Sequence, residues 1–171
     1  IMPEDTPATK IEGTKAYGAD VVTYDRYTES REEIGEALSQ KYNANLIKPY
    51  DDVRVIAGQG TVGLEIARQV SVMGVVPNAL ICCCGGGGLI AGTSIALHAH
   101  FPKTEIWCAE PEFYDDTKRS LETGAIERAQ TEKSSICDAI VTPEPGQLTF
   151  PVNRKHVSGG AVISEQQVLK T

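Results

Sequence analysis

Aromatic side chains, positive charge and long apolar runs are all scarce in this sequence of 171 residues. Aromatic residues make up 6%, and acidic residues exceed basic ones by 23 to 16, which gives a net charge of −7. A nucleic-acid surface needs clustered Lys and Arg with rings for base stacking, so a nucleic-acid partner is excluded. No apolar run approaches the ~20 residues that cross a bilayer, and Glu4 and Asp5 argue against a signal peptide. We expect a cytoplasmic protein without a membrane partner.

Spaced cysteine pairs are absent as well. A zinc site of the common kind needs pairs such as Cys-x-x-Cys, and the sequence has none. An odd number of cysteines suits a reducing compartment better than a disulfide framework. We therefore expect buried, reduced thiols that behave as small apolar side chains, at Cys82, Cys83, Cys84, Cys108 and Cys137.

What the sequence does have is an alternation of strand-like and helix-like segments. Short runs rich in valine and isoleucine predict strands, and apolar residues at spacings of three and four predict helices. The alternation predicts an α/β fold, in three layers with an open, mostly parallel sheet. The predicted strands cover residues 20–24, 45–47, 77–84, 104–109 and 161–164. The predicted helices cover residues 7–17, 30–42, 62–70, 89–100, 116–123 and 148–156, and another begins at Glu165.

Local signals predict where these elements begin and end. Thr6 and Pro7 suit the start of the first helix. Gly58-Gln59-Gly60-Thr61 predicts a turn before the third helix, and Ser158-Gly159-Gly160 predicts a turn from helix to strand. Residues 77–84 are apolar apart from Asn78, as expected for a parallel strand buried on both faces. The first residues are also expected to belong to a strand, and the last residues to a helix. Because both ends fall inside such elements, we expect an internal piece of a longer protein.

The glycine run Gly85-Gly86-Gly87-Gly88 is the most informative segment. It connects an apolar strand to a helix, where unpaired N–H groups and the positive end of the helix dipole favour a phosphate. A merely flexible turn is the alternative. The dinucleotide pattern GxGxxG fails because its third glycine would be Ile90, and no Gly-Lys-Ser/Thr follows for a Walker loop. The run therefore predicts a phosphate site that is not of either nucleotide type.

The run Cys84–Gly92 resembles the tetraglycine loop of the fold type II pyridoxal-phosphate (PLP) enzymes, in the threonine dehydratase/serine racemase branch. Other segments that fit this family are Ala16–Val22, Ile56–Thr61 with Glu65, Cys108–Pro111 and Leu148–Pro151. The resemblance implies a fold of the tryptophan synthase β-like type, incomplete in this chain. It also implies that residues 1–53 are the second half of a small domain, and residues 54–171 part of a large, cofactor-binding domain.

The resemblance further implies roles for particular residues. The N–H groups of the four glycines and of Leu89 would hold the phosphate of PLP, and Ala139 stands where the family has a glycine beside the cofactor ring. A divalent cation, Mg²⁺ or Ca²⁺, would bind at Glu110, the carbonyl of Tyr114 and Asp116. The alternative for the acidic residues is a solvated helix start. In this family the lysine that binds the cofactor lies before residue 1, so the resemblance assigns no catalytic residue to this chain.

The implied reaction is that of a serine/threonine ammonia-lyase. A small amino acid loses its Cα proton and its β-hydroxyl, and a 2-oxo acid and ammonia are released. We expect the chain to be inactive alone, to need the missing N- and C-terminal segments of the parent enzyme, and to belong to a homo-oligomer. A racemase or hydroxyaspartate dehydratase of the same family, a non-catalytic module that binds a phosphorylated ligand, and, more distantly, a Rossmann dehydrogenase stay open as alternatives.

Overall fold

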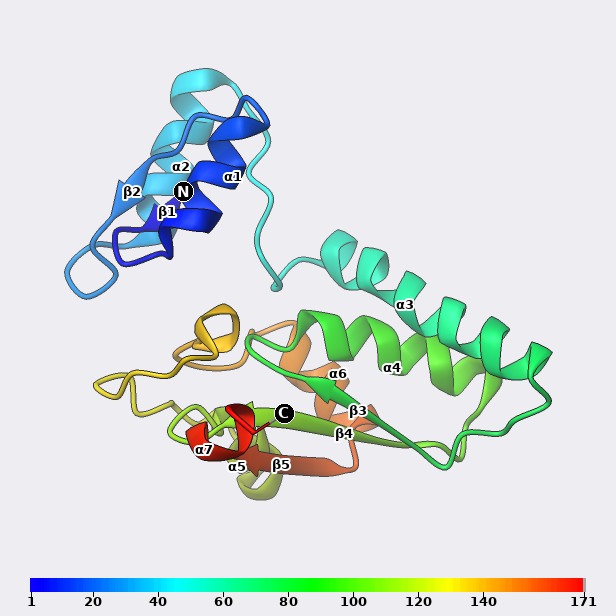
Figure 1. The fold of residues 1–171 in the computed structure, drawn as a ribbon. Helices are drawn as coiled ribbons and strands as arrows, with labels where there is room; N and C mark the ends of the chain where they lie inside the picture. Colours follow the sequence, from blue (N-terminus) through cyan, green and yellow to red (C-terminus); the bar gives the residue numbers. More distant parts are fainter. Residues whose placement is uncertain (171) are drawn as a thin grey trace. The chain divides into compact units, whose positions relative to one another are not determined.

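A computed structural model describes residues 1–170, which form two compact units, Ile1–Ile47 and a second unit that begins at Lys48 (Figure 1). The α/β class with parallel strands is confirmed in both units. The assignment of residues 1–53 to a small domain and of residues 54–171 to a cofactor-binding domain stays a prediction, because compact units within this chain do not define the domains of a longer protein. No helix among the described residues is long and apolar enough to cross a membrane.

The first unit contains two short parallel strands and two helices. Its elements are β1 (Met2–Pro3), α1 (Ala8–Ala16), β2 (Thr23–Tyr24) and α2 (Arg31–Tyr42). Ser30 caps α2 by accepting a hydrogen bond from the Glu33 N–H at 3.2 Å, and Asn43 ends this helix in a left-handed conformation. The strand predicted at 45–47 is wrong, because residues 44–48 have no regular structure. The Thr6 cap is also wrong, since Pro7 precedes α1 without a side-chain bond.

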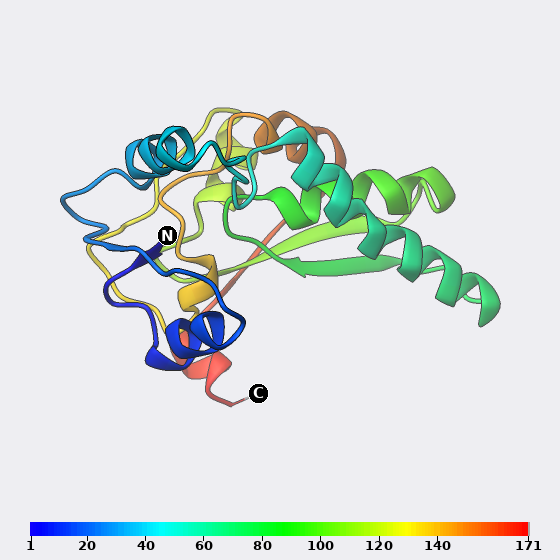
Figure 2. The same ribbon diagram turned by 90° about the horizontal axis from the view of Figure 1, so that it is seen from above.

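The second unit contains a three-stranded parallel sheet in the order β3-β4-β5. Figure 2 shows α3 and α4 lying side by side over much of their length. The elements are α3 (Val53–Val72), β3 (Ala79–Cys83), α4 (Gly88–His100), β4 (Glu105–Pro111), α5 (Asp116–Thr123), the 3₁₀ turn η1 (Asp138–Ile140), α6 (Thr149–His156), β5 (Gly159–Ile163) and α7 (Glu165–Val168). The predicted turn at Gly159-Gly160 is wrong, since both residues lie in β5.

Helix α3 is continuous, so the turn predicted at Gly58–Thr61 is wrong. Asp52 caps the helix by accepting from the Arg54 N–H at 2.8 Å. Close packing explains why glycines lie inside the helix. A Cβ on Gly63 would overlap the Thr93 carbonyl of α4, so only glycine lets the two helix backbones approach this closely. Tertiary packing has here overridden the low helix propensity of glycine.

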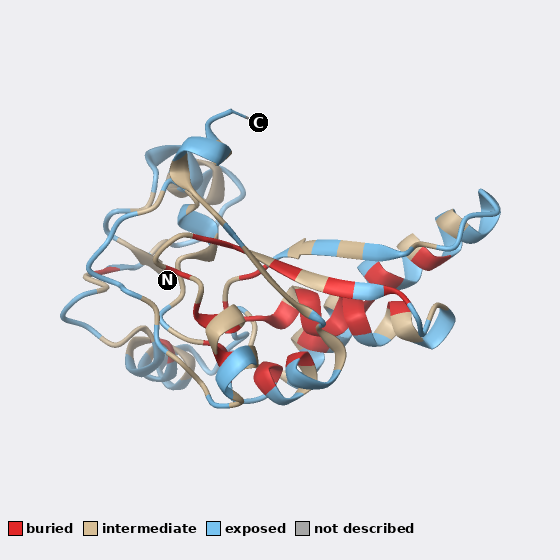
Figure 3. Cartoon of the chain, turned by 90° about the horizontal axis from the view of Figure 1, so that it is seen from below, coloured by how far each residue is buried: buried red, intermediate tan, exposed pale blue. Residues whose placement is uncertain are grey.

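The prediction that strand β3 is buried on both faces is wrong, because one face is not covered by any of the described residues. Exposure alternates along the strand, and the Ile81 side chain is 68% exposed (Figure 3). Leu80 and Cys82 on the other face pack against the core. The apolar outer face of β3 therefore has no packing partner within residues 1–170.

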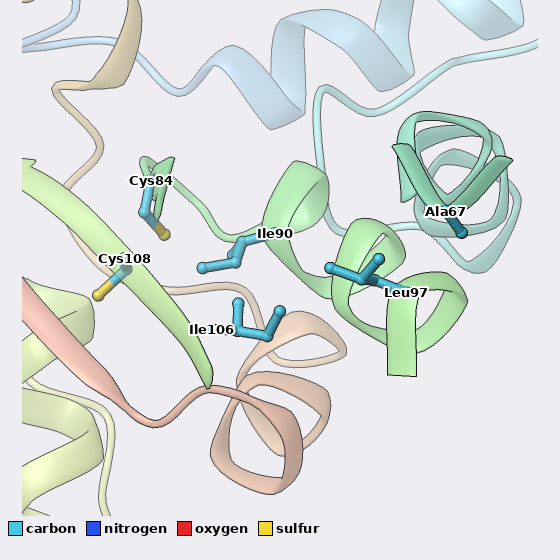
Figure 4. Close-up of a cluster of buried hydrophobic side chains, with 6 residues drawn as sticks. All are labelled: Ala67, Cys84, Ile90, Leu97, Ile106 and Cys108. Carbon is cyan, nitrogen blue, oxygen red and sulfur yellow. The ribbon is translucent and has the colours of Figure 1, made fainter. Parts of the chain in front are cut away.

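A small apolar core joins α3, α4 and the sheet (Figure 4). Its buried members are Ala67, Cys84, Ile90, Leu97, Ile106 and Cys108. All five cysteines are free thiols. Burial is confirmed for Cys84 and Cys108, whereas Cys83 on the outer face of β3 is exposed. Ile90 in the first turn of α4 and Leu97 in its last turn both belong to this core, which therefore holds the helix against the sheet along its length.

Candidate functional site

The glycine run leads from the end of β3 into the start of α4, as the sequence predicts. Gly87 is the N-cap residue, with φ of +89°, and it supplies no side-chain hydrogen bond to the helix. No hydrogen bond found within residues 1–170 is donated by the backbone N–H groups of Gly85 to Leu89. Unpaired donors at the positive end of a helix form an anion-binding site. The geometry thus suits a phosphate group.

Glycine is required here for a reason that the sequence did not reveal. A Cβ on Gly86 would overlap the Tyr50 ring, and one on Gly88 would lie 2.9 Å from the Cβ of Tyr50. At Gly87 it would lie 2.5 Å from Asn153 Nδ2. Atoms of the protein therefore occupy the positions where a Cβ on each of these three glycines would lie. Glycine permits this packing as well as the approach of a ligand.

Side chains of helix α6 hold the glycine loop by donating hydrogen bonds to the carbonyl groups of the loop. Thr149 donates its hydroxyl hydrogen bond to the Gly86 carbonyl at 2.6 Å, and Asn153 Nδ2 donates to the Gly87 carbonyl at 3.3 Å. The Gly146 N–H also donates to Gly86 O, at 3.2 Å. The Thr149 and Asn153 side chains are both fully buried. Sequence reasoning missed Thr149 and Asn153 because they lie far from the loop in sequence.

The start of α6 is fixed by Asp51. Its Oδ1 accepts hydrogen bonds from the Leu148 N–H at 2.8 Å and from the Thr149 N–H at 3.3 Å. A carboxylate at this end of a helix is favourable with the dipole. The segment that contains Tyr50 and Asp51 therefore contacts both the glycine loop and α6. These residues also escaped the sequence reasoning, which took the region only as a domain boundary.

Ala139, expected beside a cofactor ring, lies in the turn η1. Its neighbour Ile140 packs against the loop, because a Cβ on Gly85 would lie 3.2 Å from Ile140 Cα. The Thr142 hydroxyl lies 3.4 Å from the same point and has no hydrogen-bond partner among the described residues. The structure thus brings η1 to the first glycine. The role of Ala139 itself stays a prediction.

Two of the predicted cation ligands are buried acids. Glu110 is the last residue but one of β4, and it accepts from the Thr117 N–H at 2.9 Å and the Lys118 N–H at 2.8 Å. Asp116 is 1% exposed, and its Oδ2 has no hydrogen-bond partner within residues 1–170. Burial, and then the charge of Glu110, raise the pKa of Asp116 to about 8. The alternative of a solvated helix start is therefore wrong for Asp116.

The cation site itself stays a prediction. The third expected ligand, the Tyr114 carbonyl, belongs to the short connection between β4 and α5. The Tyr114 hydroxyl donates a hydrogen bond to the Lys133 carbonyl at 2.7 Å. No group of three or more His, Cys, Asp and Glu side chains that could hold a metal occurs in the part of the chain that is described. Any cation at the acidic pair would therefore need backbone carbonyls or water as further ligands.

Two histidines that look scattered in the sequence are neighbours in space. His98 Nδ1 and His156 Nδ1 lie 3.0 Å apart, and His98 Nε2 lies 2.8 Å from the Thr104 carbonyl. A carbonyl oxygen only accepts, so His98 carries its proton on Nε2. His98 Nδ1 then accepts a hydrogen bond from the Nδ1–H group of His156. Burial, and then the charge of His98, lower the pKa of His156. The pair joins the ends of α4 and α6 and includes no nucleophile.

Comparison with known proteins agrees with this geometry. The whole chain, residues 1–171, matches the family described as "Pyridoxal-phosphate dependent enzyme". It is 39% identical over 170 residues to an L-threo-3-hydroxyaspartate ammonia-lyase of Saccharomyces cerevisiae, covering 99% of this chain and 51% of that protein. It is 35% identical to a serine racemase of Schizosaccharomyces pombe, with coverage of 99% and 51%.

Solved structures give the same result. The crystal structure of a threonine deaminase from T.th. superposes with a TM-score of 0.89 at 43% identity, over 99% of this chain and 54% of that one. Maize serine racemase superposes with a TM-score of 0.88 at 33% identity, over 99% and 50%. The chain thus spans about half the length of the relatives that it matches.

Proposed function

Because the chain belongs to the pyridoxal-phosphate dependent enzyme family, we propose that it supplies the phosphate-binding part of an ammonia-lyase. The proposed substrate is a small amino acid with a hydroxyl on its β-carbon, and the products are a 2-oxo acid and ammonia. The observation that carries this proposal is the loop Gly85–Leu89, whose N–H groups have no partner within residues 1–170. Five free thiols support a reducing compartment, and so a cytoplasmic location.

The loop fits the phosphate of PLP. Gly85, Gly86, Gly87, Gly88 and Leu89 would hold it through their N–H groups, with the positive end of the α4 dipole adding to the attraction. When bound, PLP supplies an electron sink that stabilises the negative charge left at Cα after proton loss. The residues of this chain would bind the phosphate of PLP and orient the cofactor. We assign the transfer of the Cα proton to none of them.

The relatives support a β-hydroxy amino acid as the substrate class. The relatives similar to this chain include proteins named for L-threo-3-hydroxyaspartate, threonine and serine, and each of these amino acids carries a β-hydroxyl. Loss of the Cα proton and of the β-hydroxyl is one reaction common to all three. Racemisation of serine requires the same Cα proton loss, and it is the runner-up.

A chimera tests this proposal. In it, the 171 residues replace the matching 170 residues of the S. cerevisiae lyase, which supplies the regions that this chain does not cover. We expect the chimera to bind PLP and to release ammonia and a 2-oxo acid from L-threonine, L-serine or L-threo-3-hydroxyaspartate. Formation of D-serine is measured in parallel. Differences in substrate preference from the intact lyase report the contribution of this chain.

The control for the chimera is the intact lyase, purified and assayed in the same way. A folded chimera that binds PLP and makes D-serine without ammonia would favour the racemase. A folded chimera that binds PLP and changes none of the amino acids would favour a non-catalytic phosphate-binding module. A folded chimera that binds no PLP would contradict the proposal at its base.

We further propose that Glu110 and Asp116, with the Tyr114 carbonyl, bind Mg²⁺ or Ca²⁺. The support is the unpartnered Asp116 Oδ2, buried beside a second acid whose pKa burial also raises. Two buried acids with no cation nearby are costly when both are ionised. An oxygen-rich set of this kind suits a hard divalent cation.

Calcium is therefore expected to raise the unfolding temperature of the chain, and more at about pH 8 than at about pH 5, because protons compete for the carboxylates. The folded-state pKa of Asp116 lies above its ordinary value of 3.8. Without a cation, the free energy of unfolding therefore falls as the pH rises from 3.8 toward about 8. Thermal unfolding with calcium or a chelator measures both effects. Asp116→Asn should remove the calcium effect and Asp115→Asn should retain it. Equal calcium effects in the two variants would contradict the site.

A further inference from the structure

We propose that Thr149 and Asn153 are positioning residues, which set the direction of the Gly87 and Gly88 N–H groups and thereby the affinity of the loop for phosphate. The inference rests on the proposed function, because it takes this loop as the phosphate site. It adds that the binding strength of the loop is set by side chains of α6, which themselves need not contact the ligand.

The first step is the pair of contacts to consecutive carbonyl groups. The Thr149 hydroxyl holds the Gly86 carbonyl at 2.6 Å, and the Asn153 side-chain amide holds the Gly87 carbonyl at 3.3 Å. Thr149 and Asn153 are both 0% exposed, so water does not compete for these bonds. They lie four positions apart in the sequence, which places both on one face of α6. One helix face thus grips two neighbouring peptide groups.

The second step follows from the planarity of the peptide group. In a trans peptide, the carbonyl of one residue and the N–H of the next lie in one plane and point in opposite directions. No cis peptide occurs within the described residues. Since α6 holds the carbonyls of Gly86 and Gly87, the N–H groups of Gly87 and Gly88 must point away from α6. Two donors are therefore aimed together by two side chains.

The third step is that α6 is itself fixed. Asp51 accepts from two N–H groups in its first turn, and Phe150 is buried. The Gly146 N–H and the Ala91 N–H add backbone bonds to the same two carbonyls. The glycines could otherwise rotate freely, and preorganised donors bind an anion better than donors that must first be ordered.

Asn153 shows that this arrangement is more than packing. Its Oδ1 is buried and has no hydrogen-bond partner in the part of the chain that the structure describes. An unpaired buried acceptor is unfavourable, and an apolar residue of similar size would avoid it. The side-chain donor to Gly87 O is the feature that only the amide provides. An asparagine at this position, despite the unfavourable burial of its unpaired Oδ1, points to a role in orienting the loop.

The test measures the affinity of the full 171-residue chain for inorganic phosphate by calorimetric titration. Thr149→Val keeps the shape of the side chain and removes the hydroxyl, and it is expected to weaken binding about tenfold. Thr149→Ser restores the donor and should bind within about threefold of the wild type. Asn153→Leu should weaken binding about as much as Thr149→Val. The matched control is Thr104→Val, which removes another buried hydroxyl, one that donates to the Pro77 carbonyl at 2.8 Å.

Circular dichroism establishes that each variant is folded before it is titrated. If Thr149→Val does not fold, Asn153→Leu carries the same test, because it removes the donor to the Gly87 carbonyl. Affinities of folded Thr149→Val and Asn153→Leu within about twofold of the wild type would overturn the inference. Equal weakening by Thr104→Val would also overturn it, because the effect would then be general. If the wild-type chain binds no phosphate, the proposed function fails together with this inference.

Discussion

Alanine at position 87 is expected to weaken PLP binding by the chimera about 100-fold, since it removes the preorganised donors of the loop. Gly87 has φ of +89°, a conformation that costs alanine about 1–2 kcal/mol. In addition, the new Cβ would lie 2.5 Å from Asn153 Nδ2 and 3.1 Å from Thr149 Oγ1. The loop must therefore move away from α6, and its N–H groups lose their common direction.

Equilibrium titration with PLP measures the loss, and Gly74→Ala is the matched control. Gly74 also has a positive φ, of +69°, but a Cβ there would meet nothing within 4 Å. It therefore shares the backbone strain of Gly87→Ala and lacks the overlap with α6. We expect Gly74→Ala to bind PLP like the unsubstituted chimera. Similar weakening by both variants would mean that general instability, and not the geometry of the loop, determines the affinity.

Alanine at position 92 is expected to lower the free energy of unfolding of the chain by about 3 kcal/mol. The new Cβ would overlap the Ile56 carbonyl and lie 2.6 Å from the Gly60 N atom, both in the backbone of α3. Backbone atoms cannot swing aside as a flexible side chain can, so α3 and α4 must separate. Helix α4 begins at the glycine loop, and the separation should therefore weaken phosphate binding as well.

Urea denaturation of the full chain measures this change, and Gly58→Ala is the control. Gly58 lies in α3 with no atom within 4 Å of its Cβ position. Replacing an exposed helical glycine of this kind by alanine should raise the free energy of unfolding by about 1 kcal/mol. The free energy of unfolding is therefore expected to fall in Gly92→Ala and to rise in Gly58→Ala. A Gly92→Ala chain as stable as the wild type would show that α3 and α4 do not pack as closely as described.

The glycine loop could be predicted because all its parts are adjacent in the sequence. An apolar strand, four glycines and an apolar helix together indicate an uncapped helix start, and this prediction needs no tertiary information. Most helices were predicted for the same reason, since capping residues such as Ser30 and terminating residues such as Asn43 act locally. The α/β class followed from the alternation of these elements.

What depends on contacts distant in sequence could not be predicted. The bonds from Thr149 and Asn153 span 63 and 66 residues, and no periodicity signals them. The turn predicted inside α3 failed because helix-to-helix packing outweighs the weak helix propensity of Gly60 and Gly63. Burial was overestimated for β3, whose outer face has no partner among the described residues.

The acidic pair shows both sides of this limit. The resemblance to the family selected Glu110 and Asp116 by their spacing. Only the structure shows that Asp116 is buried with an unpartnered oxygen, and that burial raises its pKa to about 8. The sequence alone allowed an exposed helix start equally well. The calcium experiment tests whether a cation occupies the pair.

The central claim is that the loop of this chain binds the phosphate of PLP. Amide chemical shifts of the ¹⁵N-labelled chain, followed during titration first with inorganic phosphate and then with PLP, test it most directly. Both ligands are expected to shift the amide signals of Gly85 to Leu89, with the largest changes at Gly87 and Gly88. Unchanged signals for these five residues at saturating PLP would contradict it.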